Sequence, residues 1–340
     1  MAKKTENSGY RKYIARKWVA LIALAAALLG VGLLSLSVGS AGLPLAETLR
    51  ALFGGGEEPS RVIIWNVRMP RIATAAAVGI ALAMSGCVMQ NVLRNPLASA
   101  STLGIAQGAT FGAAVAIVYF ESGVYTVTAF AFLGGIGTTA LILLLSRVGG
   151  VTPPVMILAG VALSAMFTGA TVLVQYFSDD VRIGSIVYWT FGNLGRAGWR
   201  EIAVMFVLGG AAFIYFMLNR WNYNAMESGA HTAKSLGVNV DALLLAGMAA
   251  GTLISAVAIA FVGTINFVGL IAPHIARRLV GSDYRFLVPC SALTGAAIVL
   301  AADMLSRTLA APAVLPIGAL TSFLGAPLFL YMIIKQGKIK

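Results

Sequence analysis

The chain has 340 residues, of which 59% are hydrophobic and 11% are charged, and its formal net charge is +12. A soluble domain carries about 25% charged residues, so a soluble protein of this composition would expose large apolar patches. The composition therefore excludes an ordinary soluble protein and predicts an all-α polytopic membrane protein. The positive charge is typical of lysines and arginines that flank membrane spans, and it does not require a nucleic-acid partner.

Ten apolar runs predict membrane-spanning helices, each of which needs about 20 residues. The runs 98–120 and 264–280 are the weakest, because Gly or Pro interrupts both and the second is short. We expect one transmembrane domain at 18–335, a basic tail at 1–17 and a short tail at 336–340. In chain order the predicted spans are 18–38, 67–93, 98–120, 124–146, 153–177, 199–219, 240–262, 264–280, 286–306 and 315–335.

The distribution of positive charge predicts the orientation of these spans. Ten spans place both termini on the same side of the membrane. If that side is the cytoplasm, about two-thirds of the 24 lysines and arginines lie on the cytoplasmic side, as the positive-inside rule requires. We therefore expect a multi-pass protein of the cell (inner) membrane, in contact with lipid, with both termini in the cytoplasm.

The sequence lacks the side-chain clusters that an enzyme, a metal site or a proton pathway needs. Its two histidines, His231 and His274, lie far apart, and Asp179-Asp180 is the only pair of adjacent aspartates. Asp303 and Arg307 are four residues apart, which predicts a local ion pair on one helix face. We expect no catalytic residue, no metal site and no cofactor bound by this chain. Because there is no P-loop, ATP and Mg, if used, belong to a separate ATPase.

The segment 220–239 differs from the other connections on the predicted cytoplasmic side. It is polar and about 20 residues long, and Gly237 is a plausible residue to end a short helix. Two interpretations are open. The helix lies on lipid headgroups, or it couples the chain to an ATPase.

Several motifs, taken in order, resemble the FecCD-type permeases of importers for iron–siderophores, haem and vitamin B12. The resemblance covers about residues 60–335. The motifs are Arg68-Met69-Pro70-Arg71, Ser85-Gly86…Gln90, Arg94-Asn95-Pro96-Leu97-Ala98, Leu103-Gly104-Ile105…Gly108, Phe267-Val268-Gly269-Leu270…Pro273-His274-Ile275-Ala276-Arg277 and Leu315-Pro316-Ile317-Gly318…Thr321…Gly325-Ala326-Pro327…Phe329.

The resemblance implies the type II ATP-binding cassette (ABC) importer fold. Ten helices form each subunit, and helices two to five are related to helices seven to ten as an inverted repeat. It also implies a dimer of two permeases, most simply a homodimer. Two cytoplasmic ATPases lie below the dimer, and a substrate-binding protein docks outside. The sequence departs from the family pattern at His231 and Val314, where a glutamate is usual.

Three groups of residues are candidate functional sites. The predicted ATPase-coupling residues are Glu227, His231, Ala233, Leu236, Gly237, Arg277 and Arg278. The predicted cytoplasmic gate consists of two proline turns, Asn95-Pro96-Leu97 and Val151-Thr152-Pro153, which alternatively only end helices. Arg68, Arg71 and Arg307 oppose the inward charge bias, and we expect them to dock the binding protein. Headgroup phosphates, or pairing with Asp303 or Glu58, are the alternatives for these arginines.

We therefore expect a permease subunit that moves a metal chelate inward without an ATPase site of its own. An iron–siderophore is the first candidate cargo, and haem or cobalamin is the alternative within the same class. An ion-coupled transporter or channel, or a membrane enzyme, would require polar clusters within the spans, and these are nearly absent.

Overall fold

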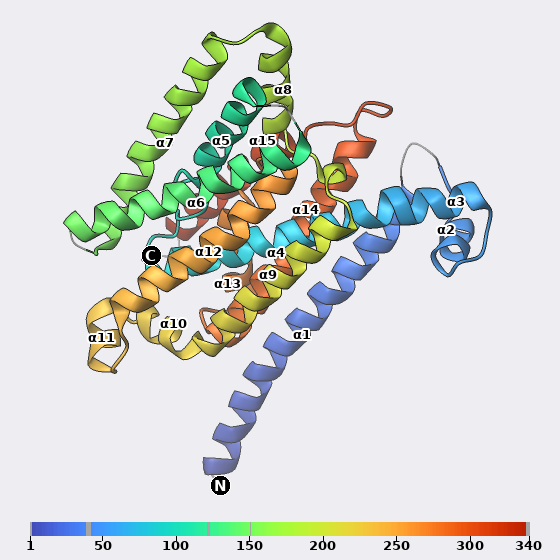
Figure 1. Cartoon of the computed structure of the whole chain (residues 1–340). Helices are drawn as coiled ribbons and strands as arrows, with labels where there is room; N and C mark the ends of the chain where they lie inside the picture. Colours follow the sequence, from blue (N-terminus) through green and yellow to red (C-terminus); the bar gives the residue numbers. More distant parts are fainter. Residues whose placement is uncertain (1, 39–41, 121–122, 150, 338–340) are drawn as a thin grey trace.

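The computed structural model describes residues 2–38, 42–120, 123–149 and 151–337, and these fold almost entirely into helices (Figure 1). The helices at the predicted spans are α1 (Ala2–Ser37), α4 (Met69–Val92), α5 (Ile105–Tyr119), α6 (Val124–Gly149), α7 (Pro153–Tyr176), α9 (Trp199–Leu218), α12 (Val240–Val262), α13 (Val268–Val280), α14 (Tyr284–Thr308) and α15 (Ile317–Gly337). Between them lie α2 (Leu45–Leu52), α3 (Glu58–Ile63), the π-helical turn η1 (Ile64–Arg68), α8 (Asp180–Thr190), the 3₁₀ turn η2 (Leu194–Arg196), α10 (Arg220–Glu227) and α11 (Ala230–Ser235).

Every predicted span coincides with a helix, so the predicted all-α polytopic fold is confirmed. Within the described residues, seven helices are long and apolar enough to cross a bilayer. The two weakest predictions correspond to short helices, since α5 has 15 residues and α13 has 13. Helix α13 begins late because Gly263 (φ 86°) and Phe267 (φ 66°) bend the chain before it.

Several boundaries differ from the prediction. The segment expected as a basic tail, 1–17, is helical from Ala2 and continuous with the first span. Helix α15 runs to Gly337, and residues 338–340 lie outside the described residues. Helices α2, α3 and α8 lie in connections for which we predicted no helix, because each is too short to show a clear hydrophobic period.

The short helices mark two faces of the molecule. The start of α1 lies toward the same end as α10 and α11, whereas α2, α3 and α8 lie toward the other end (Figure 1). We call these ends the N-terminal face and the opposite face. Because successive spans alternate in direction, α4 ends at the N-terminal face and α12 begins there.

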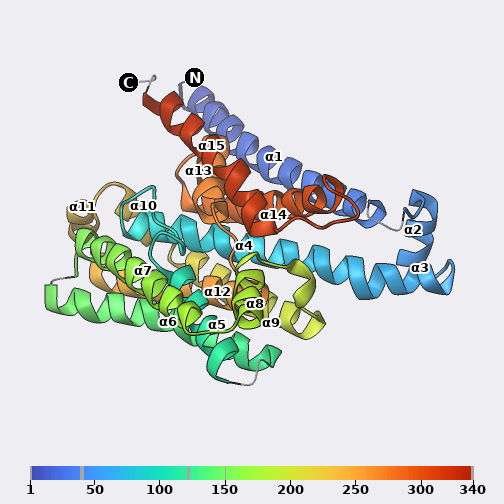
Figure 2. The same cartoon turned by 90° about the horizontal axis from the view of Figure 1, so that it is seen from above.

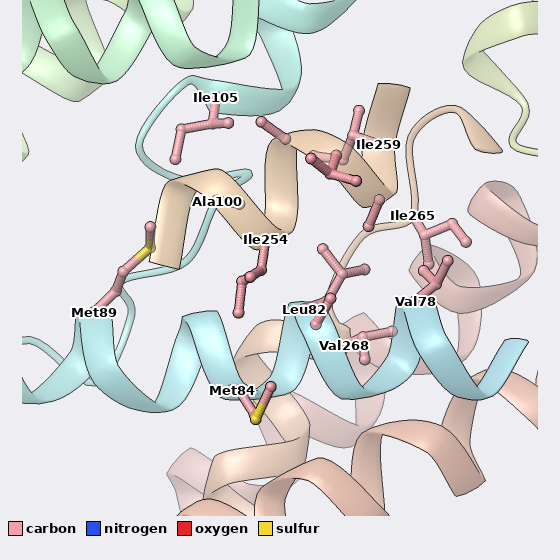
Figure 3. Packing of buried hydrophobic residues seen from close by; sticks show 14 of the residues in the cluster. Val78, Leu82, Met84, Met89, Ala100, Ile105, Ile254, Ile259, Ile265 and Val268 are labelled. Carbon is pink, nitrogen blue, oxygen red and sulfur yellow. The ribbon is translucent and has the colours of Figure 1, made fainter. Parts of the chain in front are cut away.

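Helix α4 runs through the middle of the bundle, with α1, α13, α14 and α15 on one side and α5, α6, α7 and α12 on the other (Figure 2). It packs against α9, α12, α13 and α14. Its side chains Val78, Leu82 and Met89 are buried, as are Ile254 and Ile259 of α12 (Figure 3). The core of the chain is therefore built around α4.

Glycines bring the backbone of α4 into direct contact with two neighbours. A Cβ at Gly86 would overlap the carbonyl oxygen of Gly269 on α13, and a Cβ at Gly79 would overlap that of Gly295 on α14. Such contacts gain van der Waals energy in a bilayer, where no hydrophobic effect drives helices together. Both sites require glycine because backbone atoms fill the space that a side chain would need.

The helix contacts follow the predicted inverted repeat. Helix α4 packs on α14 and α13, and in the same way α12 packs on α6 and α5. Helix α5 packs on α6 and α7, as α13 packs on α14 and α15. Residues with left-handed backbone, Gly104 (φ 80°) and Phe267 (φ 66°), directly precede α5 and α13. Since α4 and α12 begin at different faces, the two halves are related by inversion, and this prediction is confirmed.

The glycine contacts lead to a prediction for stability. We expect Gly86→Val to lower the melting temperature of the detergent-purified protein, because overpacking costs about 1–3 kcal/mol or more. Gly210→Val is the control, since a Cβ at Gly210 would meet nothing within 4 Å. Equal melting temperatures for the two variants would contradict the packing argument.

Candidate functional site

A buried carboxylate organises the opposite face. Asp303 is fully buried, and its two oxygens bind two guanidinium groups. Arg71 Nε lies 2.7 Å from Oδ1, and Arg307 Nε lies 3.0 Å from Oδ2. The predicted pair between Asp303 and Arg307 is confirmed, whereas the Arg71 contact joins α4 to α14 across 232 positions of sequence.

Arg307 and a further arginine, Arg68, form hydrogen bonds with the end of α1. Arg307 donates hydrogen bonds to the carbonyl of Val38 (2.8 Å) and to Ser35 Oγ (2.6 Å), and buried Arg68 donates one to the carbonyl of Leu36. The last carbonyls of a helix lack partners within the helix, and the dipole there favours cations. We call Arg68, Arg71, Asp303 and Arg307 the arginine cluster. It connects α1, η1, α4 and α14: Arg71 and Arg307 bind the carboxylate, and Arg68 and Arg307 bond the end of α1.

The predicted coupling segment forms a helical hairpin, α10–α11, at the N-terminal face. Gly229 (φ 113°) permits the turn between the helices. The predicted helix end at Gly237 (φ 84°) is confirmed: its N–H donates to Lys234, and the N–H of Val238 donates to Ala233, both at 3.0 Å. This is the usual glycine-terminated helix end. Ala233 is buried, while His231 and Leu236 are exposed at the tip.

Helix α10 is held against α4 by polar contacts and against α14 by aromatic packing. Asn91 on α4 donates hydrogen bonds to the carbonyl of Tyr223 (3.1 Å) and to Glu227 Oε2 (3.2 Å). The Tyr223 ring is fully buried, and its centroid lies 5.4 Å from that of Tyr284. Glu227, one of the predicted coupling residues, is therefore bonded directly to the end of the central helix.

The turn between α13 and α14 holds the other side of α10. Asn224 donates to Asp283 Oδ1 (3.2 Å), and Arg285 forms a 2.7 Å ion pair with Asp283. Burial alone would raise the pKa of the Asp283 carboxyl, but the hydrogen bonds from Arg285 and Asn224 outweigh it and lower the pKa. The stabilisation from this carboxylate is complete above its unfolded pKa of about 3.9 and is lost as the pH falls through the lower folded value.

A polar cavity of about 190 Å³ lies between α4, α10 and α13 at this face. The side-chain atoms Gln90 Oε1, Asn91 Oδ1 and Arg277 Nε are buried and have no hydrogen-bond partner within the part of the chain described. Such atoms need a hydrogen-bond partner, which is either a water molecule or a protein group that a conformational change brings close. The lining residues are Gln90, Asn91, Arg94, Pro96, Met226, Glu227 and Arg277.

The cavity brings two of the predicted groups together. Pro96 belongs to the predicted gate, while Glu227 and Arg277 belong to the predicted coupling residues. Arg278 faces elsewhere, because it donates a hydrogen bond to the carbonyl of Met332 on α15 (3.2 Å). His231 and Leu236 lie at the exposed hairpin tip.

Proline restricts both predicted gate turns, and a side-chain hydrogen bond also orders the first one. Asn95 Oδ1 accepts a 2.9 Å hydrogen bond from the Leu97 N–H, and the Leu97 side chain is exposed. Thr152 has extended backbone (φ −125°, ψ 142°), as expected of a residue before proline, and Pro153 begins α7. Val151 is half-buried against the core. Because α4 and α6 both end at the N-terminal face, both turns lie there.

Asn91 was not among the predicted site residues, and Gln90 was noted only as part of a motif. The signal was available, because Gln90-Asn91 is a polar pair near the end of an apolar span. Polar groups in a span usually face the protein interior and have a function. Both side chains are buried here.

A bundle with its charged side chains near the ends of the helices and an inverted repeat is typical of a transport permease. Residues 27–335 match the model of the FecCD transport family. The chain belongs to this family, and it is a multi-pass permease subunit of an ABC importer.

Two relatives and one solved structure show the extent of the similarity. An ABC transporter permease of Methanocaldococcus jannaschii, named provisionally, is 49% identical over 97% of this chain and 98% of its own. The hemin transport permease HmuU of Yersinia pestis is 37% identical over 89% of this chain and 93% of its own. A solved inward-facing transporter, provisionally assigned to the metal-chelate type, is 33% identical with a TM-score of 0.83, covering 93% of this chain and 98% of that one.

The arginine cluster leads to a second stability prediction. We expect Asp303→Asn to destabilise the protein by about 3–5 kcal/mol, because it leaves two guanidinium groups without their carboxylate. Asp179→Asn is the control: Asp179 and Arg182 form an exposed 3.3 Å pair, worth about 0–1 kcal/mol. Thermal unfolding in detergent checks both. Equal melting temperatures would mean that the buried carboxylate does not hold these helices together.

Proposed function

We propose that this permease imports a metal chelate, and that the chelate is an iron–siderophore. The assignment of the solved relative to the metal-chelate type supports this cargo class. The observation that carries the coupling proposal is the direct bonding of Glu227, on the α10–α11 hairpin, to Asn91 at the end of α4. A displacement of the hairpin would therefore be transmitted to α4 through this hydrogen bond.

Haem is the alternative cargo, and it is favoured by the similarity to HmuU. Haem iron is often held by histidine. His274 is buried on α13 with Nδ1 2.9 Å from the carbonyl of Leu270, and His231 lies on the hairpin at the N-terminal face. With no histidine at the opposite face, the structure offers no such ligand at the entrance, which supports the siderophore.

We propose that the N-terminal face is cytoplasmic, in the inner membrane. The N-terminal arginines and lysines and Arg94, Lys234, Arg277 and Arg278 would then lie on the cytoplasmic side, as the positive-inside rule requires. Two copies of this chain would form the pathway, with two ATPase subunits, which hold ATP and Mg, on this face. A substrate-binding protein would dock on the opposite face. ATP binding acts by stabilising one facing of the permease over the other.

The hairpin tip provides the test of this proposal. We expect the tagged full-length chain to retain its partner ATPase in a pull-down, and Leu236→Asp to abolish retention and substrate-stimulated ATP hydrolysis. Leu236 is 67% exposed, so the substitution leaves the fold intact. Phe53→Asp, at an 85% exposed position on the opposite face, is the control and should retain the ATPase. Retention of the ATPase by Leu236→Asp would exclude the tip as the docking element.

The proposed gate is tested by cross-linking. Cysteines at Leu97 or Thr152 should cross-link two copies of the chain in at least one nucleotide state, because the two turns would meet on the dimer axis. The native Cys87 and Cys290 are both buried, so they give little background. Phe53→Cys on the opposite face is the control. Absence of cross-links in every nucleotide state would locate the gate elsewhere.

We also propose that acidic residues of the binding protein dock near Arg68, Arg71 and Arg307. Arg71→Glu should reduce ATPase activity stimulated by the binding protein more than basal activity, and high salt should weaken the wild-type stimulation. Because Arg71 also binds Asp303, melting temperatures must be measured in parallel. A stable Arg71→Glu variant with full stimulation would contradict docking at this site.

A further inference from the structure

A second, larger cavity lies at the opposite face and belongs to none of the groups above. Its volume is about 450 Å³, and it lies between α8, the η2 turn and the adjoining ends of α5 and α6. Figure 1 shows α8 beside the end of α5. Two aliphatic side chains line one wall. The polar lining residues are Ser185, Tyr188, Trp189, Asn193 and Arg196.

Arg196 brings an uncompensated positive charge to this cavity. It is half-buried, and its guanidinium has no hydrogen bond or ion pair within the residues the structure describes. Burial lowers its pKa. An arginine nevertheless stays protonated at any physiological pH, because its ordinary pKa exceeds about 12. A half-buried charge of this kind is stabilised most by an anion.

Trp189 also borders the cavity, but its side chain is 2% exposed and its Nε1 is buried, so the indole N–H is out of reach of a ligand in the cavity. The donor next to Arg196 is instead supplied by Asn193. The Asn193 Oδ1 accepts from the Gly195 N–H (2.8 Å), so its amide nitrogen remains available. No acidic residue is among the lining residues described, and the free groups are mainly donors.

The segment that carries these donors is held rigidly. Asn193 N–H donates to the carbonyl of Val262 (2.7 Å), and Thr264 Oγ1 donates to the carbonyl of Thr190 (2.6 Å). Gly318 N–H donates to the carbonyl of Phe191 (2.9 Å). The donors are thus fixed in position before any ligand arrives, which reduces the entropy that binding costs.

We propose that this cavity binds an oxyanion, a carboxylate or phosphate group, through the Arg196 guanidinium and the Asn193 side-chain amide N–H. A guanidinium grips such groups with two parallel hydrogen bonds. The same chemistry is supplied by a free anion at this face or by the phosphate of a lipid headgroup. The proposal does not depend on which cargo the permease carries.

The test measures binding to the purified full-length chain in a phosphate-free maltoside detergent. Isothermal titration with citrate, with inorganic phosphate and with phosphatidylglycerol gives the affinity for each probe. We expect saturable binding of at least one probe, weakened about tenfold or more by Arg196→Gln and several-fold by Asn193→Asp, which keeps the acceptor for the Gly195 N–H but removes the amide donor. Arg182→Gln is the matched control, because Arg182 lies on the same connection but is exposed and paired with Asp179.

Each outcome either tests the proposal or identifies where the bound anion comes from. Citrate or phosphate binding that depends on Arg196 identifies a free anion, whereas binding confined to phosphatidylglycerol identifies a headgroup. Arg196→Lys keeps the positive charge but loses the planar guanidinium with its two parallel donors. It should bind with intermediate affinity if the variants are folded. Binding equally strong in wild type, Arg196→Gln and Asn193→Asp, or no binding of any probe to wild type, overturns the proposal.

Discussion

The close approach of α4 to α13 and α14 is the contact on which the rest of the structure depends. Inside a bilayer, lipid tails are as apolar as leucine, so helices associate through fitted packing and polar contacts rather than through the hydrophobic effect. Gly79 and Gly86 have no side chain at the points where the backbone of α4 contacts the backbones of α14 and α13. The central helix is therefore clamped along one side. On its other side larger side chains such as Met89 pack against α12.

Polar interactions then concentrate at the two ends of this central helix. At one end Arg71 binds the buried Asp303, and at the other end Asn91 binds Tyr223 and Glu227. A buried ion pair is costly to assemble, but it fixes one arrangement of helices because a shifted arrangement leaves charges unpaired. Packing thus holds α4 against its neighbours along its length, and the polar contacts at its two ends fix its position relative to them.

The sequence predicted what depends on local pattern and missed what depends on long-range contact. Spans follow from the length of apolar runs, and the Asp303–Arg307 pair follows from a four-residue spacing on one helix. The partner Arg71 is 232 positions away and became visible only in the folded chain. The start of α13 was misplaced because Phe267, a non-glycine residue, adopts left-handed backbone that no local rule predicts. For the same reason Arg196 gave no signal, since only the folded chain brings it beside α5, α6 and α8 in one cavity.

The distribution of polarity agrees with the transport of a bulky ligand. A span rich in charged side chains would bind such a ligand tightly and slow its release, whereas the middle of this bundle is built from small and aliphatic residues. Charged groups lie toward the ends, for example in the arginine cluster and the two polar cavities. The N-terminal cavity contains both donors and acceptors, so its lining can exchange partners as helices move. The cavity at the opposite face offers mainly donors on a rigid segment, and such a site holds a ligand without rearranging.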